Sequence, residues 1–207
     1  MTVKLVGSTS GSVSLQAPAS TTGGAHKILT LPDINSTVDT TGRAGNILQV
    51  KQTVKTSFFS TTTTGSVLDV TGVSVTITPS SSSSKILVSC FGEYGNGNND
   101  SFASLFLART IGSGSVSGDI AIGDSRGSTT RATMNATLRS GGGLSHNVSR
   151  SFGCQFLDSP NTTDAVEYKL RIYVVQGTPA CIGGGNSDNY NNFVSVPTFI
   201  TAMEVAA

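Results

Sequence analysis

Residues 151–176 constrain the fold more than any other part of the chain, because apolar residues occupy every second position on both sides of a polar break at 158–164. The alternating residues are Phe152, Cys154 and Phe156 before the break, and Val166, Tyr168, Leu170, Ile172 and Val174 after it. Successive side chains of a strand point to opposite sides of its sheet, so a period of two predicts half-buried strands. We therefore expect a strand–turn–strand hairpin whose even-numbered residues lie in the core.

The opposite face of the second run carries Glu167, Lys169 and Arg171. We expect these side chains to face solvent or a subunit interface and to be paired across strands or chains. The same period predicts a strand through Leu48, Val50, Gln52 and Val54.

The composition favours an all-β chain with few charges. Good helix formers never accumulate over ten or more residues, and Ser, Thr, Gly and Asn fill the segments between apolar runs. Charged residues make up 12% of the chain, against an average of about 25%. Such a surface suits an extracellular or virion protein that packs against copies of itself. The net charge of +1 provides no electrostatic footprint for nucleic acid.

The chain divides into two parts of different character. Residues 47–207 hold roughly ten short strands with turn signals between them, which predicts an antiparallel β-sandwich or jelly-roll-like head. Residues 1–46 hold four short candidate strands, at 2–6, 12–16, 27–32 and 36–40, with few large apolar residues. Because so small a unit cannot bury a core alone, we interpret it as an N-terminal attachment or stem segment.

Two runs in the predicted head, 85–94 and 67–78, depart from simple alternation. The run from Lys85 to Tyr94 is apolar on both faces, with Ile86, Val88 and Cys90 on one side and Leu87 and Phe91 on the other. This pattern predicts a strand buried on both sides. Residues 67–70 and 73–78 are predicted to be two strands separated by Thr71 and Gly72.

Three cysteines, Cys90, Cys154 and Cys181, occur without a CxxC pair or a Cys/His cluster. This spacing predicts no zinc site. Cys90 and Cys154 each alternate with apolar neighbours, so we expect both to be small core residues, and a single disulfide stays open as an alternative.

No catalytic motif is present. The only histidines are His26 and His146, and the GxSxG signature of a nucleophile elbow is absent. Several carboxylates are expected to fall mostly in turns, where Asp caps its own backbone. They are Asp119, Asp124, Asp158, Asp164 and Asp188. We therefore expect no enzyme, no catalytic residue, no cofactor and no metal.

Two loops rich in Asn and Gly, at 95–100 and 183–192, are the candidate binding regions. The candidate residues are Asn96, Asn98, Asn99, Asp100, Asn186, Asp188, Tyr190 and Asn192. Their oxygens could contact a surface cation, but neither loop has EF-hand spacing. Tyr190 and Phe193 beside amides could form a small sugar-binding patch.

The N-terminal residues turn polar before an apolar signal-peptide core forms, and no apolar run approaches the ~18 residues of a membrane span. We expect synthesis in a host cytoplasm and no membrane insertion.

Two sets of segments have a familiar sequence pattern. The first set is 7–19 followed by Leu29-Thr30-Leu31-Pro32, and the second is 47–50, 70–80, 85–88, 156–160 and 168–170. Both sets resemble fibre and appendage proteins of marine, especially cyanobacterial, tailed bacteriophages. The resemblance covers most of the chain and rests on structural motifs, none of them catalytic. It implies a homotrimeric virion protein whose residues 1–46 attach to another virion protein. The chain is shorter than a long tail fibre, so a short fibre, a tail tip and a head decoration all stay open.

Under this interpretation the head contacts a host-surface glycan or protein through its loops. The alternative is a glycan-binding, lectin-like adhesin module without catalysis. A polysaccharide-degrading spike is a third possibility, although the chain lacks Trp and has four Tyr to stack on sugars.

Overall fold

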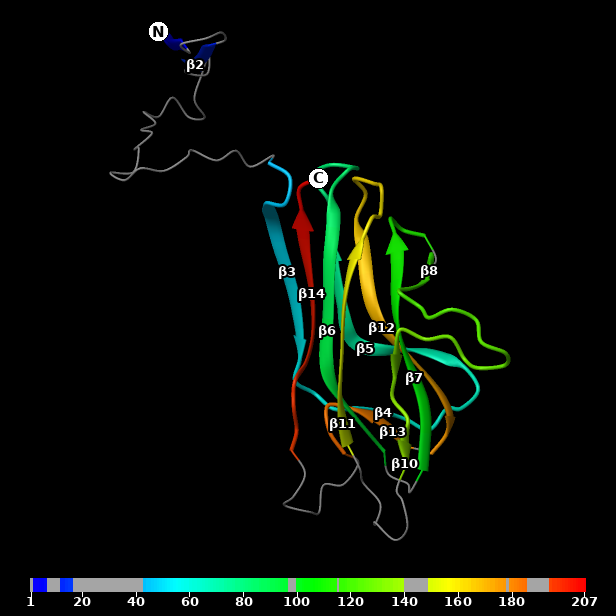
Figure 1. Ribbon diagram of the computed structural model, residues 1–207. Helices are drawn as coiled ribbons and strands as arrows, with labels where there is room; N and C mark the ends of the chain where they lie inside the picture. The colour runs from blue at the N-terminus through cyan, green and yellow to red at the C-terminus, as the bar shows by residue number, and fades with distance from the viewer. Residues whose placement is uncertain are drawn as a thin grey trace. The chain divides into compact units, whose positions relative to one another are not determined.

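The computed structural model describes residues 2–6, 12–16, 43–96, 100–114, 116–139, 149–177, 179–185 and 194–207, of which the first two segments are described by backbone only (Figure 1). The chain forms two compact units, Met1–Asp39 and Thr40–Ala207. All regular structure in the described residues is β-strand.

The first unit contains an antiparallel pair, β1 (Thr2–Val6) and β2 (Ser12–Gln16). Thr2 pairs with Gln16 and Val6 with Ser12. These two strands confirm the prediction from the alternating sequence. The strands predicted at 27–32 and 36–40 lie outside the described residues.

The second unit is an antiparallel β-sandwich of two sheets, as predicted. The first sheet has the order β3-β14-β6-β13-β4, with β11 on the other edge of β6. Its strands are β3 (Ile47–Lys55), β4 (Phe59–Thr61), β6 (Lys85–Asn96), β11 (Ser149–Asp158), β13 (Ala180–Ile182) and β14 (Thr198–Val205).

The second sheet has the order β10-β7-β12-β5, and the short strands β8 and β9 also pair with β7. Its strands are β5 (Val67–Ile77), β7 (Asp100–Ile111), β8 (Gly118–Ile120), β9 (Met134–Asn135), β10 (Leu138–Arg139) and β12 (Val166–Gln176). The weak alternation of residues 131–138 therefore corresponds to two short pairings rather than to one strand.

The core lies between the two sheets and includes even-numbered residues of 151–176 that alternation selected. Tyr168, Leu170 and Ile172 of β12 are fully buried, and Phe152 of β11 is 7% exposed. Cys154 and Phe156 are partly buried and pack against this core. The predicted core side of both strands is thus confirmed.

The predicted hairpin of β11 with β12 is wrong. β11 pairs with β6 in the first sheet, whereas β12 pairs with β5 and β7 in the second. The segment 159–165 therefore crosses from the first sheet to the second. Alternation predicts that each strand has a buried side, but it does not predict which strand pairs with it in the sheet.

Strand β5 is continuous, so the prediction of two separate strands is also wrong. Lys169 pairs with Ser74 and Arg171 pairs with Asp69, so four residues of β5 lie opposite Leu170 alone. Gly72 within this bulge has a φ of +84°, a left-handed conformation that glycine adopts without strain. The Thr71-Gly72 signal marks a bulge and not a strand end.

Strand β6 is not buried on both sides in a single chain, contrary to the sequence-based expectation. Ile86, Val88 and Cys90 are fully buried in the core, but Phe91 on the other side is 41% exposed and Leu87 is half-buried. Among the described residues of the second unit, no other layer covers that side.

Candidate functional site

The connections that contain the predicted binding residues begin and end at one end of the head. Asn96, the last residue of β6, pairs with Ala180, and Asp100, the first residue of β7, pairs with Arg139. Ser149 at the start of β11 pairs with Gly95. The described residues that flank 97–99, 140–148 and 186–193 are therefore neighbours at the lower end of the head in Figure 1.

Glycines allow the backbone segments at this end to pack directly on one another. A Cβ at Gly95 would lie 2.3 Å from the carbonyl oxygen of Gly184, and a Cβ at Gly177 would lie 2.2 Å from that of Asp100. The N–H of Gly183 donates to the carbonyl of Glu93 at 2.9 Å. The described backbone at this end of the head, which we call the loop-bearing end after the predicted binding loops, is thus closely packed.

A buried polar contact ties β6 to β7 at the same end. The Tyr94 hydroxyl is hydrogen-bonded to the Ser101 hydroxyl, and Ser101 Oγ also lies 3.3 Å from the carbonyl oxygen of Gly177. Burial raises the pKa of Tyr94, so its hydroxyl stays protonated at neutral pH.

The structure places two of the eight predicted binding residues. Asp100 is half-buried at the start of β7, and Asn96 is fully buried within β6. The prediction that Asn96 presents its amide in an exposed loop is wrong, because β6 continues through this residue and β13 pairs with it. The other six are Asn98, Asn99, Asn186, Asp188, Tyr190 and Asn192, which lie outside the described residues and stay predictions.

A second polar region covers the outer side of β12. Asp69 bridges Lys169 at 3.1 Å and Arg171 at 3.2 Å, and Arg171 also reaches Asp119 at 3.1 Å. Glu167 lies 3.2 Å from Lys169. The predicted pairing of the β12 charges across strands is confirmed. The hydrogen bond from Lys169 to Asp69 raises the pKa of Lys169.

This region borders a shallow cavity of about 200 Å³ along the β5 bulge. Both basic groups there are already matched by carboxylates, so the surface has no excess positive charge to offer a polyanion. Its ion pairs are partly exposed, and each contributes little to stability.

The third polar group joins the two sheets. Arg109 Nη1 of β7 lies 2.8 Å from Asp158 Oδ1 and 2.9 Å from Oδ2, and the Tyr168 hydroxyl donates to Oδ2 at 2.7 Å. Asp158 was expected in a turn, but it is the last residue of β11 and is 5% exposed. Burial and the hydrogen bond to Asp158 raise the pKa of Tyr168, so this hydroxyl remains the donor.

Glu204 of β14 is a second buried carboxylate with donors on several sides. Its Oε1 accepts from the Ser80 N–H at 2.7 Å and the Ser80 hydroxyl at 2.6 Å, and its Oε2 accepts from Gln49 Nε2 at 2.6 Å. Burial alone would raise the pKa of Glu204, but the hydrogen bonds from Ser80, Gln49 and Ser84 together hold it below its usual value. This arrangement stabilises a fixed carboxylate rather than a proton-transfer group.

The cysteines are free thiols. Cys90 and Cys154 lie opposite each other in the register of β6 and β11, and Cys181 is fully buried in β13. Burial raises the pKa of Cys90 and of Cys154, and raises that of Cys181 to about 12.

Among the described residues, no group of three or more His, Cys, Asp or Glu side chains could hold a metal ion. No helix in that part of the chain is long and apolar enough to cross a membrane. His26 and His146 lie outside the described residues.

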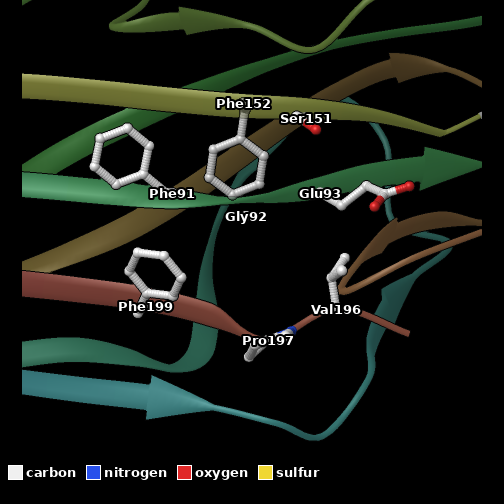
Figure 2. Close-up of a pocket in the computed structure, with 8 residues that line it drawn as sticks. All are labelled: Phe91, Gly92, Glu93, Ser151, Phe152, Val196, Pro197 and Phe199. Carbon is white, nitrogen blue, oxygen red and sulfur yellow. The ribbon is translucent and has the colours of Figure 1, made fainter. Parts of the chain in front are cut away.

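Sequence reasoning missed an apolar hollow on the outer side of the first sheet. A cavity of about 250 Å³ is lined by Phe91, Gly92, Glu93, Ser151, Phe152, Val196, Pro197 and Phe199. Figure 2 shows the rings of Phe91 and Phe199 beside one another on adjacent strands. Their centroids are 5.9 Å apart and their planes are inclined by 43°. The signal in the sequence was the apolar pattern on both faces of β6.

The fold is therefore an antiparallel β-sandwich with an open apolar face on its first sheet, and the described residues that flank the predicted binding segments lie at one end of it. Neither a protein-family model nor a curated protein matches the sequence.

Two solved structures that match the chain are those of infectious bursal disease virus, from the Gt and Gx strains. The Gt chain is 13% identical with a TM-score of 0.43, and the Gx chain is 14% identical with a TM-score of 0.36. Each match covers 98% of this chain and 46% of the other, so this chain spans less than half the length of either. Similarity at this level carries no argument about function.

Proposed function

We propose that the protein is a structural component of a virion, a short fibre, tail-tip or head-decorating appendage that contacts the host surface and performs no catalysis. In this proposal residues 1–46 attach to another virion protein, and the head presents its loops outward. The low charge and the resemblance of residues 7–19, 29–32 and the head motifs to phage appendage proteins support this assignment.

The observation that carries the proposal is the polarity of the head. Asn46 and Ala206 are joined by a backbone hydrogen bond of 2.9 Å, and Ile47 of β3 pairs with Val205 beside Lys85, the first residue of β6. The predicted binding loops are flanked by residues at the other end of β6, near Asn96. The chain therefore enters the head at one end, and the loop-bearing end lies opposite.

This polarity suits an appendage whose entry end faces the particle and whose far end meets a host molecule. Loops that rise from a rigid scaffold are a frequent location of binding residues. A host-surface glycan or protein is the proposed ligand class, and no nucleic acid or inserted membrane is involved. We also propose that copies of the chain associate, because low surface charge suits a chain that packs against itself, and the resemblance to phage appendage proteins implies a homotrimer.

A deletion of residues 1–39, the first compact unit, tests the attachment. We expect the shortened chain to keep the melting temperature of the head and to disappear from purified virions, as measured by mass spectrometry of the particles. A single substitution in an exposed head loop, Asp124→Asn, is the control and should leave incorporation unchanged. Normal incorporation of the deleted chain would contradict the proposed attachment, and absence of the full chain from virions would contradict the virion assignment.

Glycan arrays and host-cell binding test the other end. Saturable binding that is lost when residues 186–192 are replaced by a Gly/Ser linker would support receptor contact. Binding that survives this replacement would show that the loop is not the contact.

A further inference from the structure

The outer side of the first sheet is an apolar face without charges at its centre. The strands β3, β14, β6 and β11 lie side by side, and their registers place outward-facing side chains in three rows. The rows are Val54-Phe199-Phe91-Gly153, then Gln52-Thr201-Ser89-Gln155, then Val50-Met203-Leu87-Leu157. Lys85 and Glu93 are the nearest charged residues of β6 and lie beyond the outer rows.

The face is open in a single chain. Val50 is 53% exposed, Val54 51%, Leu157 45% and Phe91 41%. In the middle row the Gln52 amide donates to the Thr201 hydroxyl at 2.8 Å. An apolar field with a small polar row and charges at its margin has the composition of the centre of a protein–protein interface.

The orientation of β3 provides independent evidence that this face contacts another surface. Its apolar side chains, Val50 and Val54, point away from the head core, whereas Gln49 reaches Glu204 and the Thr78 carbonyl on the inner side. A one-residue shift in register would exchange the two sides of a strand. This register leaves the apolar side of β3 outward, and contact with another surface would stabilise it by removing these side chains from water.

The shape of the face suits a flat partner. The Phe91 ring lies over Gly153, because a Cβ at position 153 would lie 2.4 Å from Phe91 Cδ1. The missing side chain thus lets the ring lie along the sheet instead of standing up from it. The rings of Phe91 and Phe199 form a continuous surface next to the cavity (Figure 2).

The size of the face agrees with an oligomer contact. Four strands about 4.8 Å apart, over the five residues that the three rows span at about 3.4 Å each, give a flat area of roughly 330 Å² before side-chain relief is added. The largest apolar patch on a typical monomer covers about 300–600 Å². A stable interface buries about 800 Å² on each partner, so this face has the size of the apolar centre of such an interface.

We propose that this face, formed by the outward side chains of β3, β14, β6 and β11, is covered by a second copy of the same chain. A copy is the occupant that the low charge favours, since another surface of the same sparsely charged chain can cover this face with no uncompensated ion buried between them. The inference deepens the self-association proposed above, and its test uses the purified full-length chain alone. If the purified chain does not self-associate, the virion assignment is unaffected. If the chain is absent from virions, the proposed contact between copies is unaffected.

The decisive comparison uses two valines with the same exposure. Val50 lies on the face and Val175 lies on β12 of the other sheet, and both are 53% exposed. Light scattering on the wild-type chain should give a multiple of the 21.2 kDa chain mass. Val50→Lys should reduce it to the mass of one chain, because an ammonium group cannot be buried unpaired. Val175→Lys should leave the wild-type mass.

A second substitution at the opposite edge of the face, Leu157→Lys, should have the same effect as Val50→Lys. Circular dichroism melting identifies any variant that fails to fold. If either Val50→Lys or Leu157→Lys fails to fold, the mass of the other variant decides whether the face is the contact. In the dissociated variant, the Met203 thioether should be oxidised by hydrogen peroxide faster than in the wild type, while the core residue Met134 is unchanged. A monomeric wild type, or dissociation by Val175→Lys as well, would overturn the proposal.

Discussion

Arg109 and Asp158 join the two sheets of the head through two contacts of one guanidinium nitrogen, at 2.8 and 2.9 Å. Arg109 belongs to β7, and Asp158 ends β11 in the opposite sheet. The Tyr168 hydroxyl adds a third donor to the same carboxylate. The chain crosses between the sheets immediately after Asp158, so this group fixes the point at which the crossover begins.

Asp158→Asn should lower the free energy of unfolding by about 3 kcal/mol, because it leaves the largely buried Arg109 guanidinium without its counterion. Urea denaturation monitored by circular dichroism measures the loss. Asp164→Asn, in the exposed part of the same crossover, is the matched control and should change stability by less than about 0.5 kcal/mol. Equal stability of the two variants would contradict a role for Asp158 in joining the sheets.

Glu204 should make the head less stable in acid. Its pKa lies below the usual 4.5, so the folded state binds the proton more weakly than the unfolded state does. Such a group contributes its full stabilisation above its unfolded pKa, and the contribution is lost as the pH falls through its folded pKa. We expect the free energy of unfolding to fall as the pH decreases below the usual pKa of a glutamate side chain.

Glu204→Gln tests this origin of the pH dependence. The substitution should cost about 2 kcal/mol at neutral pH, because charge-assisted hydrogen bonds from Ser80 and Gln49 are lost. It should also flatten the acid slope in urea titrations. Asp124→Asn, in an exposed loop, should retain the wild-type slope. An unchanged slope in Glu204→Gln would assign the acid sensitivity to other groups.

The thiols of Cys90 and Cys181 should resist alkylation in the folded protein. Burial raises the pKa of Cys181 to about 12, so at pH ~8 only about one thiol in 10⁴ is the reactive thiolate. Iodoacetamide labelling followed by mass spectrometry should modify Cys154 first, because it is only half-buried, and all three in urea. An engineered Ser125→Cys on an exposed loop is the reactive control. Fewer than three labelled thiols in urea without reductant would reveal a disulfide instead.

Three glycine substitutions should differ in cost according to what surrounds each glycine. Gly95→Ala should destabilise the head by at least about 2 kcal/mol, because its Cβ meets the backbone of Gly184. Gly153→Ala should cost less, since the Phe91 ring that it meets is exposed and can rotate away. Gly123→Ala has open space around it and is the control. Thermal melting orders the three, and a Gly95→Ala variant as stable as the control would contradict direct backbone packing at the loop-bearing end.

The candidate site was only partly predictable. The period of two correctly placed the β12 charges on the outer side, where Lys169 and Arg171 meet Asp69. It could not show that Asn96 belongs to a strand rather than to the loop after it, because composition marks a turn within a few residues but not the last paired residue. The role of Asp158 was also missed, since its partners Arg109 and Tyr168 come from other strands.

The amino-acid sequence by itself determined that the head is all-β and which side of β11 and β12 faces the core. These properties are local, because the direction of a strand side chain depends on its position in the alternation. Only the tertiary structure decided that β11 and β12 lie in different sheets, that β5 passes through Gly72 without ending, and that Val50 points outward. Strand partners depend on contacts between residues far apart in the chain, and local periodicity holds no information about them.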